Sequence, residues 1–313
     1  MLRRSLNLFL LLCFLAAPLA AQEIAYEKYQ LDTGLTVILH EDHSLPVACI
    51  NTWYFVGGKD EPEGRSGFAH LFEHLMFMGT ERVPGSDFDN IMEAGGGWNN
   101  ASTGWDRTNY FSFGPSNLLP TLMWLDADRL EALGANMNSE KLEKQREVVL
   151  NERRQTSENR PYGVADLKIS ELIYPLGHPY HLWVIGTVAD IKAATVQDVK
   201  DFFATFYLPN NASLVIAGDF DPQEIKPLVA KLFGTIPRDA DPVHAAAEPL
   251  KLESVKRVTY TDKVQFGRLT MVWHSPALFA PGDAEMDLAA AVLSSGKTSR
   301  LYKRLVYEDQ LAT

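Results

Sequence analysis

The sequence predicts an α+β fold, in which strands and helices interleave along a chain of about two domains. The 313 residues are 46% hydrophobic and 22% charged, which is an ordinary globular composition, and domains usually span roughly 100–200 residues. Short segments with strand character precede longer segments with helical periodicity. The order strand, strand, turn, helix in residues 26–78 recurs in residues 255–293, which indicates a second domain of similar design.

Turn and capping residues position the elements of the first domain. Residues 26–40 are expected to form two strands around a turn at Asp32–Gly34, and Pro46–Phe55 a third. Ser66 is the expected N-cap of a helix over residues 67–78. By the same signals we expect a helix after Ser86, two short strands within 98–113, helices at 116–133, 140–158 and 161–173, a helix with a capping box at Thr195 and Asp198, and a buried strand at 212–218.

Residues 235–250 are expected to be a linker, because they hold three prolines and several alanines without an apolar pattern. They separate a first domain at 22–234 from a second at 251–313. The second is far shorter than the first, so we expect it to be truncated. Its predicted elements are strands at 255–262 and 266–275 and helices at 283–293 and 297–311.

The first 21 residues have the pattern of a secretory signal peptide: two arginines, a mostly apolar run from Leu6 to Leu15, then small residues. We therefore expect residues 1–21 to be removed and the protein to be exported, either periplasmic or secreted. A membrane anchor is the alternative, but the apolar run is shorter than the roughly 20 residues of a spanning helix. Of two cysteines only Cys49 then remains, so no intrachain disulfide is expected. The net charge of −11 argues against nucleic acid as a partner.

The candidate chemistry lies in one predicted helix, where His70 and His74 are four residues apart and Glu73 lies between them. At 3.6 residues per turn, both imidazoles leave the same face, close enough to share a metal ion. This H-x-x-E-H pattern is the inverse of H-E-x-x-H, in which two histidines bind zinc and the glutamate is the general base. A solvated turn with two surface histidines is the alternative. Against this alternative, the other residues of the helix are apolar on almost every side, which indicates that the helix is buried. Its two histidines and glutamate then need polar partners, which a metal ion would provide.

A catalytic zinc usually has three protein ligands, and the predicted helix at 140–158 offers the best acids for the third. Glu152 lies three and four residues after Val149 and Val148, so it can point along the apolar face of that helix. Glu147 is turned away from it by about 140°. Most acids in such helices are solvated, so Glu152 is a candidate only in combination with the histidine helix.

These residues resemble the insulinase/pitrilysin family of zinc peptidases, which includes the mitochondrial processing peptidase. The segment Gly57–Thr80 is similar to the family signature almost throughout, and Gln145–Glu152 resembles the helix that carries the third ligand. The resemblance covers most of residues 25–313. It implies a two-layer α/β sandwich with a mainly antiparallel sheet, followed by the start of a similar, non-catalytic domain. It also implies one Zn²⁺ per chain, held by His70, His74 and Glu152.

Two further segments carry the resemblance. Gly96–Thr103 is similar to the edge strand beside the family's metal, where an extended peptide adds by main-chain pairing, which makes Asn100 and Ala101 candidate substrate contacts. From the residues alone, a strand with a glycine-rich start explains this segment equally well. At the position of Gln145 the family has a glutamate that does not bind the metal itself but helps to orient the residues that do. His178–Thr187 matches a family loop without an assigned catalytic role.

The implied function is a zinc-dependent endopeptidase that acts on oligopeptides or small unfolded proteins, with Glu73 as general base toward a metal-activated water. One alternative is a catalytically silent homologue that serves as a partner subunit; against it, His70, Glu73, His74 and Glu152 are all present. Another is an exported peptide-binding or metal-binding protein without turnover. The expected partner is a peptide substrate, and the resemblance leaves open a homodimer or a partner subunit of the same family.

Overall fold

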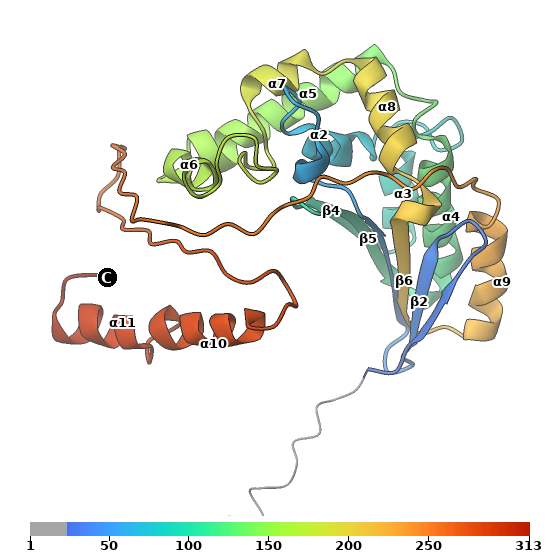
Figure 1. Ribbon diagram of the computed structural model, residues 1–313. Helices are drawn as coiled ribbons and strands as arrows, with labels where there is room; N and C mark the ends of the chain where they lie inside the picture. The colour runs from blue at the N-terminus through green and yellow to red at the C-terminus, as the bar shows by residue number, and fades with distance from the viewer. Residues whose placement is uncertain (1–23) are drawn as a thin grey trace, which may run out of the picture.

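The computed structural model describes residues 24–313, so the expected signal peptide lies outside the described residues. A six-stranded sheet in the order β1-β2-β6-β3-β5-β4 forms the main body, and helices cover one of its faces (Figure 1). Neighbouring strands are antiparallel except β2 and β6, which are parallel. The predicted two-layer α+β sandwich with a mainly antiparallel sheet is confirmed. The strands are β1 (Glu27–Gln30), β2 (Thr36–Glu41), β3 (Val47–Tyr54), β4 (Trp98–Thr103), β5 (Thr108–Pro115) and β6 (Ala212–Gly218).

The helices of the first domain follow the predicted order, with two additions that were not predicted, α7 and α9. The capping box at Thr195 and Asp198 is present at the start of α8. Within residues 24–313, no helix is long and apolar enough to span a bilayer. The longer helices are α2 (Phe68–Leu75), α3 (Asp87–Ala94), α4 (Leu119–Ala132), α5 (Ser139–Arg153), α6 (Gly163–Ile173), α7 (Val188–Ala193), α8 (Val196–Phe206), α9 (Pro222–Phe233) and α10 (Asp283–Ser294).

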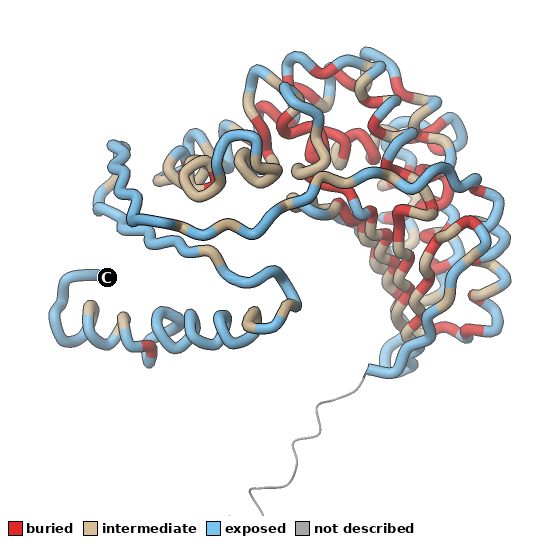
Figure 2. The backbone as a smooth tube through the Cα atoms, viewed as in Figure 1, coloured by how far each residue is buried: buried red, intermediate tan, exposed pale blue. Residues whose placement is uncertain are grey.

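The core lies between the sheet and the helices (Figure 2). Strand β3 alternates half-buried and buried residues along its whole length, as expected for a strand with one covered face. Its buried side chains face the helices: Thr52 donates a hydrogen bond to Asp126 of α4 at 2.5 Å, and Tyr54 packs against Tyr207 with ring centroids 4.5 Å apart. This packing fixes the sheet and the helices as one unit.

Helix α2 starts differently from the prediction. Gly67, not Ser66, is its N-cap, and the backbone at Gly67 has φ = 83°, a conformation in which serine would be strained. Ser66 instead donates from its hydroxyl to Asp190 in the first turn of α7. The capping acceptor is the side-chain carboxyl group of Glu61, whose oxygens accept the N–H groups of Gly67 and Ala69 at 3.0 and 2.8 Å. The start of this helix is therefore set by residues distant in sequence.

The predicted strands at 255–262 and 266–275 are wrong, since neither segment has strand structure. A strand requires a neighbour for its main-chain hydrogen bonds, and no described segment pairs with either of them. Helix α10 forms as predicted, but its apolar side chains are not covered: Leu288 is 67% exposed and Val292 46%. Figures 1 and 2 show this exposed part of the chain, red in Figure 1, set apart from the sheet.

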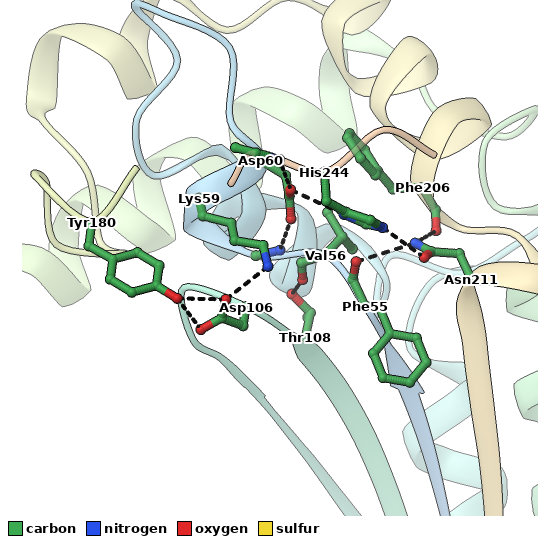
Figure 3. Close-up of polar contacts among 12 residues, drawn as sticks. Phe55, Val56, Lys59, Asp60, Asp106, Thr108, Tyr180, Phe206, Asn211 and His244 are labelled. Atoms are coloured by element: carbon green, nitrogen blue, oxygen red, sulfur yellow. Dashed lines mark hydrogen bonds and ion pairs between the residues drawn. The ribbon is translucent and has the colours of Figure 1, made fainter. Parts of the chain in front are cut away.

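Polar contacts hold the predicted linker against the first domain (Figure 3). His244 places Nδ1 3.1 Å from Asp60 Oδ1 and Nε2 3.2 Å from Asn211 Oδ1. The N–H of Ala245 donates to the same Asp60 oxygen at 3.2 Å. The side chain of Asp60 is fully buried. The linker is thus anchored to the loop that leads into α2.

Candidate metal centre

Helices α2 and α5 bring the three predicted ligands together. His70 and His74 leave one face of α2 with ring centroids 4.9 Å apart. Glu152 reaches them from α5, with Oε1 3.7 Å from His70 Nε2 and Oε2 3.1 Å from His74 Nε2. One ligand atom from each of the three residues lies within 4.8 Å of the other two. The spacing along α2 explains the histidine pair, and the packing of α5 on α2 supplies the acid.

The environment of these side chains favours the protonation states of metal ligands. His70 is 9% exposed, and its burial lowers the pKa to about 4, against the opposing effect of the Glu152 charge. The imidazole is therefore neutral at pH 7. The pKa of Glu152 is lowered, mainly by its hydrogen bond with His74. Neutral imidazoles and an ionised carboxylate are the forms that coordinate a metal.

The donor set also fits the size of a zinc site. Zinc binds histidine nitrogen and carboxylate oxygen at about 2.0–2.2 Å, so ligand atoms in a tetrahedron lie roughly 3.3–3.6 Å apart. The two separations that Glu152 makes with His70 and His74, 3.7 and 3.1 Å, lie on either side of this range. Two imidazoles and one carboxylate form a common catalytic zinc set, which leaves a fourth position for water.

Gln145 is close to the site but does not contact the ligand histidines by hydrogen bonds. Its amide nitrogen lies 2.7 Å from Met78 Sδ. His70 Nδ1 is buried and has no hydrogen-bond partner among the described residues. Among the described residues, Gln145 therefore supplies no orienting hydrogen bond to His70.

Glu73 lies on the same turn of α2 and faces β4. The hydroxyl of Thr103, the last residue of β4, donates to Glu73 Oε2. Burial raises the pKa of Glu73, while the Thr103 bond and the charge of His74 act against this shift. A raised pKa makes the carboxylate a stronger proton acceptor. Thr103 was not predicted as a site residue, because a contact between residues thirty positions apart leaves no local signal.

The predicted substrate contacts lie on an edge of the sheet. β4 is the last strand of the sheet order, so one of its sides has no neighbouring strand among residues 24–313. Asn100 is exposed there and Ala101 is half-buried. The Asn100 side-chain oxygen accepts the N–H of Ala101 at 2.8 Å, so this main-chain donor is not used in the ladder with β5. In general, an unpaired strand edge is a surface to which an extended peptide can add as a further strand.

Comparisons with known proteins match nearly the whole chain. The family model described as "Insulinase (Peptidase family M16)" covers residues 36–174, and "Peptidase M16 inactive domain" covers residues 193–313. The chain is 31% identical over 309 residues to the zinc protease PqqE of Helicobacter pylori. This alignment covers 97% of the chain and 69% of that protein. The chain spans about half the length of several mycobacterial zinc proteases that it also matches.

Solved structures have the same fold. The crystal structure of a protease from Helicobacter pylori has a TM-score of 0.83 at 28% identity, over 93% of this chain and 70% of that one. The periplasmic protease PqqL from Escherichia coli has a TM-score of 0.67 at 21% identity, over 74% of this chain and 26% of that one, which is a likeness of fold alone. From these matches, the chain belongs to the insulinase family, peptidase family M16, and its bacterial relatives are named zinc proteases.

Proposed function

We propose that this protein is a zinc-dependent endopeptidase that hydrolyses oligopeptides or small unfolded proteins. The convergence of His70, His74 and Glu152 within 4.8 Å carries the proposal. We assign one Zn²⁺ per chain to these three residues and the role of general base to Glu73. Residues 22–234 are then the catalytic domain, and residues 251–313 are part of a non-catalytic one. The signal-like residues 1–21 support export, as does the periplasmic location in the name of the structural neighbour PqqL.

In the proposed hydrolysis, His70, His74 and Glu152 hold the metal and Glu73 transfers the proton. Zinc, when bound, lowers the pKa of a coordinated water toward about 7 and polarises the scissile carbonyl. Glu73 takes the proton from the attacking water and later delivers it to the leaving amine nitrogen. Its burial, which raises its pKa, supports both steps: the carboxylate is a better base, and the protonated form persists until the amine departs.

The free edge of β4 positions the substrate. An extended peptide that pairs with β4 replaces the Asn100 side-chain oxygen by its own carbonyl as acceptor for the Ala101 N–H. Asn100 and Ala101 are therefore the proposed substrate contacts. Main-chain pairing of this kind recognises the backbone, which suits an enzyme for unfolded segments. A homodimer or a partner subunit of the same family stays compatible with this proposal.

Zinc analysis combined with cleavage of a quenched fluorescent peptide tests the proposal. The purified chain is expected to hold zinc and to cleave the peptide. The variant Glu73→Gln is expected to keep the zinc and to lose about 10²–10⁴ in rate, the usual contribution of acid–base catalysis. Zinc without cleavage by the parent chain supports the alternative, a catalytically silent peptide-binding homologue. Absence of both would overturn the assignment of the metal site.

A further inference from the structure

The hairpin between β4 and β5 determines which main-chain groups of β4 face the free edge. Gly104 donates its N–H to the carbonyl of Arg107 at 2.8 Å, and this pair continues the register of the two strands. In an antiparallel ladder, hydrogen-bonded pairs alternate with pairs whose main-chain groups point away from each other. Counting back from Gly104, the residues whose main-chain groups face the free edge are Thr103, Ala101 and Asn99.

An independent contact agrees with this count. The N–H of Ala101 donates to the Asn100 side chain at 2.8 Å and therefore points to the outer side of the strand, away from β5. Thr103 has the same main-chain orientation, two residues further along. Any peptide that pairs with the end of β4 therefore meets the N–H and carbonyl of Thr103.

The side chain of Thr103 points in a different direction, toward the helix layer. Side chains two residues apart in a strand lie on one face of the sheet, and Asn99 on this face bonds Asp89 of α3 at 2.8 Å. The Thr103 hydroxyl reaches α2 in the same layer and donates to Glu73 Oε2. Thr103 thus turns its main chain to the substrate edge and its hydroxyl to the proposed base.

We propose that Thr103 is a positioning residue that couples peptide pairing on β4 to the orientation of the Glu73 carboxylate. This inference rests on the proposed function. With Oε2 held by the Thr103 hydroxyl, Oε1 of Glu73 is the oxygen left for proton transfer. A peptide paired with the main chain of Thr103 restrains the end of β4, and the hydroxyl transmits that restraint to the base. Misplacement of a reacting group by about 1 Å is enough to cost roughly 10² in rate.

Two substitutions at Thr103 separate the hydroxyl from the shape of the side chain. Thr103→Val removes the donor at nearly constant volume, and we expect kcat to fall about 10–100-fold while KM changes little. Thr103→Ser restores the donor and is expected to stay within about threefold of the parent kcat. Both variants are expected to keep full zinc. Ser102→Ala is the matched control, since its hydroxyl bonds Asn109 on β5 and not Glu73.

A double-mutant cycle in metal-free protein tests the contact without any activity. The urea midpoints of Thr103→Val, Glu73→Met, which removes the acceptor, and the double variant are compared with the parent. If the hydroxyl holds the carboxylate, the two shifts are not additive, and the double variant loses less than their sum. Additive shifts would show that the contact contributes nothing in solution and would overturn the proposal.

The outcomes distinguish this inference from the function on which it rests. An active, zinc-loaded parent with an equally active Thr103→Val variant overturns the role of Thr103 and leaves the peptidase assignment intact. A parent chain without zinc or cleavage overturns both. A loss of kcat in Thr103→Val that Thr103→Ser does not rescue would show that the methyl packing, and not the hydroxyl, matters, which also contradicts the proposal.

Discussion

The guanidinium of Arg153 donates from Nη1 to the main-chain carbonyl of Gly186 at 2.6 Å. Arg153 directly follows Glu152 in α5. Gly186 lies against the start of α2, where a Cβ on Gly186 would overlap the carbonyl of Ser66 and the nitrogen of Gly67. One loop therefore connects the two helices that supply the proposed ligands, and the geometry of the metal site depends on it.

Arg153→Met should weaken both the fold and the metal site. The substitution leaves the Gly186 carbonyl without its charged donor, which typically costs about 1–3 kcal/mol of stability, and it loosens α5 against α2. Urea unfolding and competition with a zinc chelator measure the two effects. Arg154→Met is the control, because Arg154 is exposed and its loss should change stability by less than about 0.5 kcal/mol. Equal behaviour of the two variants would contradict this role of Arg153.

Gly186→Ala should be more destabilising than Gly64→Ala, although both glycines have positive φ, +68° and +73°. A Cβ at Gly64 meets nothing within 4 Å, so that variant bears only the backbone strain of about 1–2 kcal/mol. At Gly186 the overlap with the start of α2 adds about 1–3 kcal/mol. Thermal unfolding of both variants checks the order. Equal melting temperatures would mean that the loop is free to move away.

Glu61 should make stability depend on pH. Burial raises its pKa to about 8, while the N–H groups that it accepts, those of Gly67 and Ala69 included, favour the ionised form. The folded protein then binds this proton more tightly than the unfolded chain, whose value is near 4.5. The contribution of protonated Glu61 to the free energy of unfolding is therefore complete below about pH 4.5. It is lost as the pH rises through about 8.

Urea midpoints between pH 5 and pH 9 measure this contribution. The parent should lose stability over that range relative to Glu61→Gln, which does not titrate. The exposed neighbour Glu63 provides the control, and Glu63→Gln should retain the parent slope. A parent and a Glu61→Gln variant with the same slope would contradict the shifted pKa.

His244 should protect the linker from proteolysis. Its imidazole contacts Asp60 and Asn211, so His244→Ala is expected to speed cleavage within residues 239–248 by a protease of broad specificity. His43, which is exposed two residues after the end of β2, supplies the control variant His43→Ala. Mass spectrometry of the fragments follows the rate of cleavage in the parent and the two variants. Equal rates in all three proteins would show that the contacts of His244 do not hold the linker.

Local signals explain most of the first domain. The alternation of β3, the histidine spacing in α2 and the capping box at Thr195 each depend on residues close in sequence, and these features appear where the sequence predicts them. Helix α9 is not among the predicted elements; it contains Pro227, a residue that usually ends a helix.

Features that depend on distant residues were not predictable in the same way. The N-cap of α2 is Gly67 and not the predicted Ser66, because Glu61 supplies the capping acceptor from across a loop. The segments at 255–262 and 266–275 have strand-like composition, but a strand also needs a neighbour, and composition does not provide one. Arg153 lies in no motif, and Thr103 ends the segment Gly96–Thr103 with no local sign of its bond to Glu73. Both residues reach the site through tertiary contacts.

The zinc content of two glutamate variants on α5 tests the central claim most directly. Glu152 faces the histidines of α2, whereas Glu147 on the same helix is exposed. After dialysis against a weak chelator, elemental analysis should find one zinc per chain in the parent and in Glu147→Gln, and a clear loss in Glu152→Gln. Full zinc in Glu152→Gln, or none in the parent, would contradict the assignment of His70, His74 and Glu152 as the metal ligands.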